Sequence, residues 1–522
     1  MTEAAGCVQL LIPLVVGIAA LMAYHGHIGR EGCVGIDLGT TFSVVAVRRV
    51  DSDEVVVIPD WETGAPTVPS VVAFGVSPPV AGGPARGALH THPRSTLYNA
   101  KRFIGRPFTD PITAAEAPLH PFGIVSGPMM PPPPGAAVGN AAQQAKARRR
   151  WHERAAAGPE YTWFRPTGAA AVAGDVNPRT VGTHVLQRLK ASVAAALGHD
   201  VARQAVMAHP VEFLPHQLEE TRLAFLAAGY NVVRMIDEPT AAAVAYGLNN
   251  DPSVHYVLIY DFGGGTLDCS VLYINQGLVQ VLETTGDRLL GGEGACPSLS
   301  LSLSLSLSLF VRLLICFLLL LLSSSMARED FDQRMVTLLL DTIAQSLPDA
   351  ASAAGAGTAR IDAALRCAPA DAWAALAARG AEQSVAMPCS FSTLKQGAER
   401  AKRELSSATS ATFECAIAAC APGSAAGEGE STRPLRALRV VVTRAAYEDA
   451  CADLYKRAMA PVHEILNASS TGPEDIDEVV LVGGSSRLPK VKSLLFDIFG
   501  RNANDRIDPD LCVAIGAASL ID

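Results

Sequence analysis

Two stretches of the chain share one pattern, and this pattern decides the fold class. The first reads GCVGIDLGTTFSVVAV (residues 32–47) and the second reads HYVLIYDFGGGTLDCSVLYI (residues 255–274). Each has an apolar run, an aspartate, a glycine turn with threonine, and a second alternating run, which predicts a β-hairpin. The two copies lie much further apart than the repeats of a solenoid. The sequence therefore predicts a duplicated α/β domain, each half of which begins with a hairpin whose glycine-rich tip can face a ligand.

The hairpin tips carry the residue types that bind phosphate. Glycine lets the backbone approach a phosphate closely, and successive N–H groups form an anion-binding concavity. Asp37 and Asp268 supply carboxylates beside the glycines, where a hydrated Mg²⁺ bound to substrate phosphates needs them. A third glycine turn lies in EVVLVGGSSRLPKVKSLL (residues 478–495), between a predicted strand and a predicted helix whose N-terminus attracts anions. One Gly-Gly pair is usually a plain turn, but three such strand-to-glycine elements together predict a nucleotide site.

Other nucleotide-binding patterns are missing from the sequence. The P-loop pattern GxxxxGK[ST] does not occur. The tripeptide DFG at residues 261–263 is typical of protein kinases, but no HRD catalytic loop accompanies it. Neither a P-loop protein nor a protein kinase is therefore expected.

Composition narrows the choice of partners further. The chain has 522 residues, enough for two to four domain-sized units, and a formal net charge of −9, which argues against nucleic acid as a partner. The basic cluster KARRRWHER (residues 146–154) is interpreted as a solvated loop. Eleven cysteines include no CxxC pair and no spacing typical of zinc.

The N-terminus begins with an apolar run, CVQLLIPLVVGIAALMAY (residues 7–24). Its length is close to the roughly 20 residues of a membrane-spanning helix and to the core of a long signal peptide. We interpret residues 1–28 as a secretory signal or signal-anchor, which predicts the endoplasmic reticulum or secretory pathway. An apolar helix packed on the body of a cytoplasmic protein is the alternative.

Seven motifs, in order along the chain, resemble the nucleotide-binding domain of the 70-kDa heat-shock chaperones. They are IDLGTTFSVVAV, NAKRFIGR, RMIDEPTAAAVAYGL, YDFGGGTLDCSVL, ERAKRELSS, EVVLVGGSSRLPKV and DPDLCVAIGAA. The resemblance covers residues 33–522 apart from two insertions. It implies the actin-like ATPase fold, in which two duplicated α/β lobes enclose ATP. It places the first lobe at residues 32–250 with an insertion at about 129–160, the second lobe at 251–504, and a return to the first lobe at 505–522.

The resemblance also implies roles for the residues that carry phosphate chemistry. Lys101 matches the lysine that reaches the γ-phosphate, and Glu238 matches the carboxylate near the attacking water. Asp37 and Asp268 match the carboxylates that hold Mg²⁺ through water. The phosphate loops, with two further residues facing the same region, are Gly39, Thr40, Thr41, Phe42, Gly264, Gly265, Thr266 and Asp261. A lysine, two magnesium carboxylates and a water-orienting acid are sufficient for phosphoryl transfer, which depends mainly on positioning and charge neutralisation.

Adenosine recognition is assigned to two other motifs. In ERAKRELSS, four polar side chains recur at helical spacing and are expected on one helix face. Arg403 can stack on adenine, while the others can bond adenosine; the alternative for Glu399 and Arg403 is an ordinary i,i+4 surface pair. The full set, with the third glycine turn closing the other side of the base, is Glu399, Lys402, Arg403, Ser406, Gly484, Ser485, Ser486 and Arg487.

The C-terminal end of the sequence, GAASLID, leads us to expect no peptide-binding domain. The chain is in this respect similar to a truncated microsomal subgroup of the family, the stress ATPase cores, and HPVEF (residues 209–213) and DPDL (residues 508–511) favour the same subgroup. His209 is expected at a strand end without a chemical role. The expected protein is a slow Mg²⁺-ATP hydrolase that releases ADP, with co-chaperones or exchange factors as partners and membrane contact only through the N-terminal segment.

An insertion interrupts the second lobe. The family pattern Gly-Gly-Glu-Asp-Phe-Asp begins at Gly291 and resumes at Asp330, separated by residues 294–329, which contain an alternating Leu-Ser repeat. The unbroken apolar part, residues 313–322, is half the length of a bilayer-spanning helix, about 20 residues. Because pyrimidine tracts encode Leu-Ser repeats and precede the 3′ ends of introns, we hypothesise a retained or mis-annotated intron. Transcript reads that always contain these codons would contradict this hypothesis.

Two other functions remain open from the sequence. A small-molecule kinase can share the actin-like fold, since fold alone does not determine function. A nucleotide-sensing interaction module would bind ATP without turnover.

Overall fold

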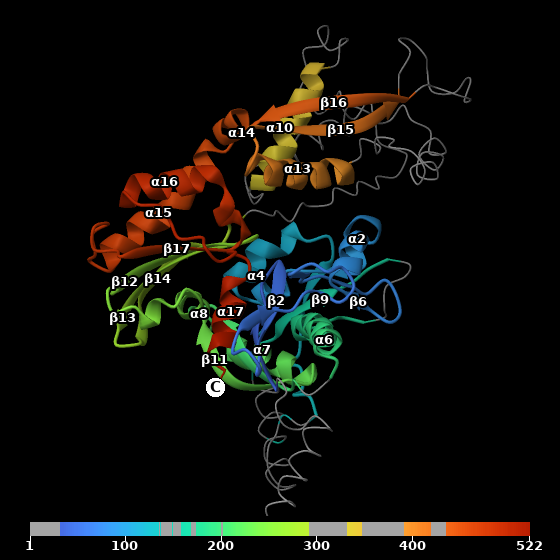
Figure 1. Cartoon of the computed structure of the whole chain (residues 1–522). Coiled ribbons are helices and arrows are strands. Elements are labelled where there is room, and N and C mark those ends of the chain that lie inside the picture. The colour runs from blue at the N-terminus through green and yellow to red at the C-terminus, as the bar shows by residue number, and fades with distance from the viewer. Residues whose placement is uncertain are drawn as a thin grey trace, which may run out of the picture. The chain divides into compact units, whose positions relative to one another are not determined.

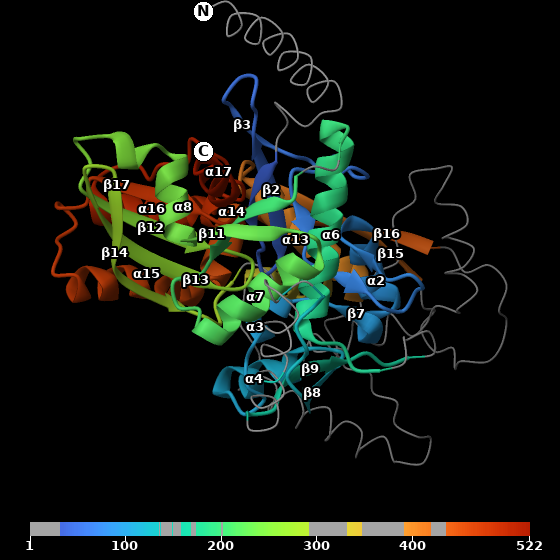
Figure 2. The same ribbon diagram turned by 90° about the horizontal axis from the view of Figure 1, so that it is seen from below.

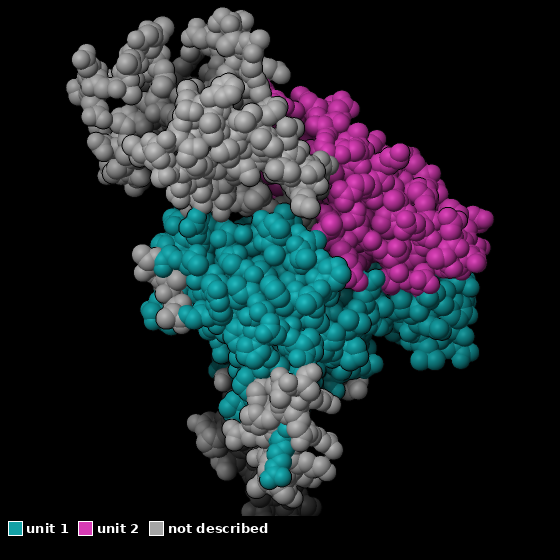
Figure 3. Space-filling model, turned by 180° about the vertical axis from the view of Figure 1, so that it is seen from behind, with its two compact units in different colours: residues 1–259, 271–282, 505–522 teal, residues 260–270, 283–504 magenta. Residues whose placement is uncertain are grey.

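The computed structural model describes residues 32–134, 136, 149, 158–168, 174–199, 202–291, 331–346, 391–418 and 435–521. The N-terminal apolar run, most of the basic cluster and residues 294–329 lie outside these ranges. Within them, no helix combines the length and the apolar character that crossing a membrane requires. The chain divides into two compact units: unit 1 comprises residues 1–259, 271–282 and 505–522, and unit 2 comprises residues 260–270 and 283–504 (Figure 3).

Unit 1 is built on a sheet with the strand order β11-β10-β1-β2-β3, and β4 pairs with β2 (Figure 1). Strands β1, β10 and β11 are parallel, whereas β1 and β2 are antiparallel, with Gly35 opposite Ala46. The predicted first hairpin is therefore confirmed. The strands of this sheet are β1 (Cys33–Asp37), β2 (Phe42–Arg48), β3 (Val55–Val57), β4 (Val68–Pro69), β10 (Gln204–His209) and β11 (Asn231–Asp237).

Helices cover this sheet through close backbone contacts and a large apolar core. The long helix α6 (Pro178–Leu197) begins at Asn177, whose side chain accepts a hydrogen bond from the Arg179 N–H, and ends at Gly198 in the left-handed region. It packs against α7 (Pro215–Ala227), as Figure 2 shows. The core between helices and sheet is formed by residues such as Val34, Ile36, Val185, Leu189, Met207 and Phe225.

Small residues bring the C-terminal helix α17 (Cys512–Ser519) onto the first strand. A Cβ at Gly35 would overlap the Ala518 backbone, and one at Gly516 would overlap the Ala241 carbonyl in α8 (Glu238–Ala245). The family-like motif DPDLCVAIGAA thus returns to unit 1, because only glycine and alanine allow backbones to approach so closely.

A smaller part of unit 1 carries short elements beside the main sheet. It contains a three-stranded sheet, β6-β5-β7, and the antiparallel pair β8–β9. Their bounds, with those of the accompanying helices, are β5 (Val72–Ala73), β6 (Val80–Ala81), α2 (Gly83–Thr91), β7 (Thr96–Leu97), α3 (Ala100–Phe103), α4 (Pro111–Glu116), β8 (Gly123–Gly127) and β9 (Tyr161–Arg165).

The second sheet has the strand order β14-β13-β12-β17, and the division between the units passes through three of its strands. Strands β12 (Tyr256–Phe262) and β13 (Leu267–Asn275) are neighbours, which confirms the second predicted hairpin; β14 (Leu278–Asp287) follows. Strand β17 (Glu478–Val482) leads through the 3-10 turn η5 (Gly484–Arg487) into α16 (Pro489–Phe499). This order of strand, glycine turn and helix is the one that the sequence predicted.

The rest of unit 2 is a helical layer with a β-ribbon. Helices α10 (Phe331–Ser346) and α13 (Phe391–Leu405) pack against the antiparallel pair β15 (Ser410–Ala418) and β16 (Leu435–Thr443) (Figure 1). Helices α14 (Arg444–Ala450) and α15 (Ala452–Ala468) follow. The predicted α/β architecture is thus observed in both units.

Candidate functional site

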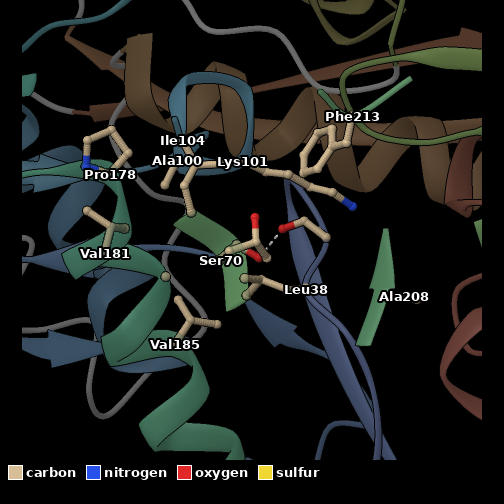
Figure 4. A pocket seen from close by; sticks show the side chains of 13 residues that line it. Leu38, Ser70, Ala100, Lys101, Ile104, Pro178, Val181, Val185, Ala208 and Phe213 are labelled. Carbon is tan, nitrogen blue, oxygen red and sulfur yellow. Dashed lines mark hydrogen bonds between the residues drawn. The ribbon is translucent and has the colours of Figure 1, made fainter. Parts of the chain in front are cut away.

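Serine side chains hold the tip of the β1–β2 hairpin in place. The Ser70 hydroxyl donates a hydrogen bond of 2.8 Å to the Gly39 carbonyl, shown as a dashed line in Figure 4, and lies 2.9 Å from the Ser43 hydroxyl. The Ser70 N–H also donates to the Thr41 carbonyl. A Cβ at Gly39 would overlap the Phe42 carbonyl, so this turn requires glycine. The predicted first phosphate loop is therefore a fixed turn, and sequence reasoning missed Ser70.

Lys101 and Glu238 meet beside this tip. Lys101 lies on the short helix α3, and Glu238 is the first residue of α8. The Lys101 ammonium donates a hydrogen bond of 2.5 Å to Glu238 Oε1 and lies 4.0 Å from Asp37 Oδ1. The three side chains are between 13% and 19% exposed, so this ion pair is largely shielded from water. The structure thus brings together three residues predicted for phosphate chemistry.

Asp37 is the most strongly perturbed acid of this group. Burial raises the pKa of its carboxyl to about 7; the Lys101 charge opposes this rise, whereas Glu238 and Asp510 add to it. Among the described residues, Asp37 Oδ1 is buried without a hydrogen-bond partner. A carboxylate with an unsatisfied oxygen and an elevated pKa is one that a nearby cation stabilises. Asp510, in the DPDL stretch, is a contributor that sequence reasoning missed.

A small cavity lies behind the hairpin tip. Its walls are largely apolar, with Leu38, Ala100, Ile104, Val181 and Phe213 among them, and the Lys101 side chain passes along one side (Figure 4). About 20 Å³ is reachable by the centre of a water molecule, which is room for about one water. The cavity is therefore no ligand site.

In unit 2, the second and third glycine turns touch each other. The Ser485 hydroxyl donates to the Gly263 carbonyl at 2.9 Å, and the Gly263 N–H donates to the Thr266 carbonyl at 3.0 Å. Gly483 has a φ of 76°, and a Cβ there would lie 2.6 Å from the Phe262 carbonyl. The turn with Gly264, Gly265 and Thr266 thus adjoins the turn with Gly484, Ser485, Ser486 and Arg487.

The two aspartates of the second hairpin flank a buried thiol. Asp261 is in β12 and Asp268 is in β13, and their charges add to the burial that raises the pKa of Cys269 well above its usual range. Carboxylate oxygens such as those of Asp261 and Asp268 are ligands that Mg²⁺ prefers. Among the described residues, no group of three or more His, Cys, Asp or Glu side chains is arranged to hold a metal ion directly. A magnesium ion held through water stays a prediction.

On α13, the predicted adenosine residues differ in how they are held. Glu399 and Arg403 form an i,i+4 pair of 2.9 Å, with the Arg403 side chain 63% exposed. Lys402 instead forms an ion pair of 2.8 Å with Asp332 Oδ1, and both side chains are nearly buried. Ser406 lies just beyond the last residue of the helix, and its hydroxyl donates to the Lys402 carbonyl. Asp332, which sequence reasoning missed, could have been found from the resumed DFD pattern.

His209 lies at the end of β10, as expected. Its Nδ1 atom is 3.4 Å from Asp237 Oδ1. The pKa of Asp237 is raised by burial, with the His209 interaction lowering it and the Glu238 charge raising it. His209 thus adjoins Asp237, the N-cap residue of α8, rather than Lys101 or Glu238 themselves.

Comparison with known proteins identifies the family. The family described as "Hsp70 protein" matches residues 33–132, 166–295 and 383–521. The chain is 30% identical over 487 residues to a heat shock 70 kDa protein of Neurospora crassa, and 31% identical over 487 residues to one of Ajellomyces capsulatus. It is also 31% identical over 487 residues to the mitochondrial heat shock 70 kDa protein of Pisum sativum.

These alignments cover 93% of this chain and 57%, 52% and 54% of the three relatives, respectively, so the chain spans about half the length of the curated relatives it matches. The family match breaks off at residue 295 and resumes at 383. That gap includes the Leu-Ser segment, whose origin as an intron stays a prediction. The motifs, the actin-like α/β architecture and the family match over most of the chain agree: the protein belongs to the Hsp70 family.

Proposed function

We propose that this chain binds Mg²⁺-ATP and hydrolyses it slowly to ADP and phosphate. The observation that carries this proposal is the Lys101–Glu238 ion pair, with Asp37 at 4.0 Å from Lys101, beside the fixed tip of the β1–β2 hairpin. The membership in the Hsp70 family supports the same conclusion.

In unit 1, Lys101 and Glu238 have distinct roles in phosphoryl transfer. Lys101 supplies a positive charge for the phosphoryl group in transfer, because charge neutralisation is a main part of this catalysis. Glu238 accepts a hydrogen bond from the attacking water and orients it toward phosphorus. The water oxygen forms the new P–O bond, the bond to the bridging oxygen of ADP breaks, and the water proton passes to solvent or phosphate.

Asp37 and Asp268 are the residues proposed to hold Mg²⁺ through water, with Asp261 and Thr266 close by in sequence. When bound, the ion neutralises phosphate charge during the transfer. The unsatisfied Asp37 Oδ1 fits such a role. The glycine turns with Gly39–Phe42 and Gly264–Thr266 are proposed to offer backbone N–H groups to the phosphates.

Unit 2 is proposed to supply adenosine recognition. Arg403, 63% exposed, is free to turn its guanidinium plane toward an aromatic base. Ser406 and the η5 turn add polar groups. Lys402 is held by its ion pair with Asp332. Its contribution to adenosine binding would therefore come from the charge and position of that pair.

Phosphate release and calorimetric titration with Mg²⁺-ATP on the purified protein test the proposal. We expect micromolar or tighter binding that EDTA weakens, and turnover that Lys101→Ala and Glu238→Ala each lower by about 10²- to 10³-fold while binding remains. Binding without any turnover in the parent protein would favour a nucleotide-sensing module. Transfer of phosphate to a small molecule, with little release to water, would favour a kinase. No magnesium-dependent binding at all would overturn the proposal.

We also propose that residues 1–28 direct the chain into the secretory pathway, as the apolar run 7–24 supports. Expression of the full chain with a C-terminal fluorescent tag should give a reticular pattern, and deletion of residues 1–28 should give a diffuse one. A diffuse pattern for the full chain would place the protein in the cytoplasm instead.

A further inference from the structure

We propose that the buried Arg102–Glu116 ion pair is a positioning element for Lys101 and thereby sets the rate of phosphoryl transfer. The inference rests on the proposed function, because it assigns the supporting residues of the same site. It concerns unit 1 alone. Neither Arg102 nor Glu116 is placed against a substrate; both act through the helix that carries Lys101.

Helix α3 is too short to be stable without contacts to the rest of the protein. It contains four residues, Ala100–Phe103, and isolated helices of this length do not form in water. Its N-cap residue, Asn99, has a φ of 59°, in the left-handed region, and gives no side-chain cap. The direction in which the Lys101 side chain points therefore depends on the contacts between α3 and the neighbouring elements.

Lys101 and Arg102 are neighbours in sequence with opposite surroundings. Successive residues on a helix point about 100° apart, so the two side chains leave α3 in different directions. Lys101 meets Glu238 and Asp37, whereas Arg102 Nη1 bonds Glu116 Oε1 at 2.8 Å. The Arg102 and Glu116 side chains are 6% and 0% exposed, respectively. Taking two charges out of water has a large desolvation cost, and a replacement by apolar residues is often as stable. A buried ion pair at this place is therefore best explained by the specific orientation that it imposes on α3.

The segment from Glu116 to His120 contacts α3 and its N-cap residue at three places. Glu116 is the last residue of α4, and its carbonyl lies 2.9 Å from His120 Nδ1. His120 Nε2 lies 3.3 Å from Asn99 Nδ2, at the N-terminus of α3. At the other end, the Phe103 ring packs edge-to-face on His120 with a centroid distance of 5.3 Å. The ion pair lies between these contacts and fixes the rotation of α3 about its axis, which apolar packing alone specifies less tightly.

The decisive variant is the double substitution Arg102→Met/Glu116→Leu. It replaces the ion pair by apolar side chains of similar volume, which keeps the fold while removing the directional contact. The matched control is Arg165→Met/Asp175→Leu, which removes an ion pair of 2.7 Å in the same unit where the arginine is 55% exposed. We expect kcat for ATP to fall about 10- to 100-fold in the first variant and to stay unchanged in the control, because small displacements of a positioned group have effects of this size. Nucleotide affinity should change less than about threefold.

A double-mutant cycle separates positioning from general weakening. In a Lys101→Ala background, removal of the Arg102–Glu116 pair should have no further effect on kcat, because the group that the pair positions is already gone. An equal loss of kcat in both backgrounds, or an unchanged kcat in the Lys101-containing variant, would overturn the proposal. If the double variant does not fold, by circular dichroism, Arg102→Lys gives the same comparison, since lysine keeps the charge and loses the planar guanidinium that makes the directional contact with Glu116.

A readout that needs no turnover distinguishes a failure of this inference from a failure of the proposed function. Acylation of the Lys101 amine by a lysine-reactive reagent, followed by mass spectrometry, reports how well the amine is held in its ion pair. The apolar variant should label Lys101 about tenfold faster, while Lys190 on α6 labels at the parent rate. Parent protein without turnover but with this selective increase would remove the ATPase proposal and keep the positioning role. Unchanged Lys101 labelling would remove the positioning role even where the parent turns over.

Discussion

The two units present their candidate site residues in different ways. In unit 1, Lys101, Glu238 and Asp37 are nearly buried, and the Lys101 ammonium lies within 4.0 Å of both carboxylates. On α13 of unit 2, Arg403 is 63% exposed and, within the part of the chain that the structure describes, pairs with its helical neighbour Glu399. Buried charges must be paired because an unpaired buried charge is very costly, whereas an exposed pair contributes about 0–1 kcal/mol.

We propose that this difference reflects a division of work between the units. A pre-arranged set of charges suits chemistry, which needs groups held before the reaction. An exposed arginine suits binding, because it can adapt to the flat face of a base. Unit 1 would then mainly determine the rate, and unit 2 mainly the affinity. Substitutions in each unit test this contrast.

The largest effect is expected at the unit 1 ion pair. Lys101→Ala and Glu238→Ala should each lower kcat by about 10²- to 10³-fold, the size typical of removing one electrostatic contributor. The double variant should be little worse than either single one, since the residues act as a unit. Single-turnover kinetics with Mg²⁺-ATP measures this. Strictly multiplicative losses would show that the two residues act independently.

The next effect concerns the glycine at the hairpin tip. Gly39→Ala would drive its Cβ into the Phe42 carbonyl, and overpacking of this kind destabilises by about 1–3 kcal/mol. We expect a lower urea midpoint and weaker nucleotide binding. The matched control is Gly87→Ala in α2, where nothing lies within 4 Å of the added Cβ and alanine favours the helix. Equal behaviour of the two variants would mean that the tip relaxes freely.

A smaller effect is expected at Arg403. Arg403→Ala should weaken nucleotide affinity about three- to tenfold through loss of a cation–π contact, with kcat unchanged. The urea midpoint should stay at the parent value, because the pair with Glu399 is exposed. Calorimetry combined with steady-state kinetics tests this. A fall in kcat at unchanged affinity would contradict the division of work between the units.

The last expected effect is a pH dependence of stability from Asp37. Its pKa is raised from 3.8 to about 7, so between these values the folded state retains a proton that the unfolded chain releases. The stabilisation from this proton is complete below about pH 4 and is lost as the pH rises through 7. Urea midpoints of the nucleotide-free protein from pH 5 to pH 8 should therefore fall, and Asp37→Asn should show a shallower fall. A parallel slope in the variant would assign the pH dependence to other groups.

The fold class and the identity of most candidate residues could be predicted from the sequence alone. Both glycine hairpins, the third glycine turn and the helix with Glu399 and Arg403 follow from alternation, glycine and 3.6-residue spacing, which are local properties of the chain. The seven family-like motifs named Lys101 and Glu238, although no local pattern relates them.

Which charged side chains meet could not be predicted and depends on the tertiary structure. The contacts of Lys101 with Glu238, Arg102 with Glu116, and Lys402 with Asp332 join different elements of the fold. Ser70 behind the hairpin tip and Asp510 near Asp37 also escaped sequence reasoning. The physical reason is that a pKa or an ion pair depends on burial and on distances of a few ångströms, and the path of the whole chain sets both.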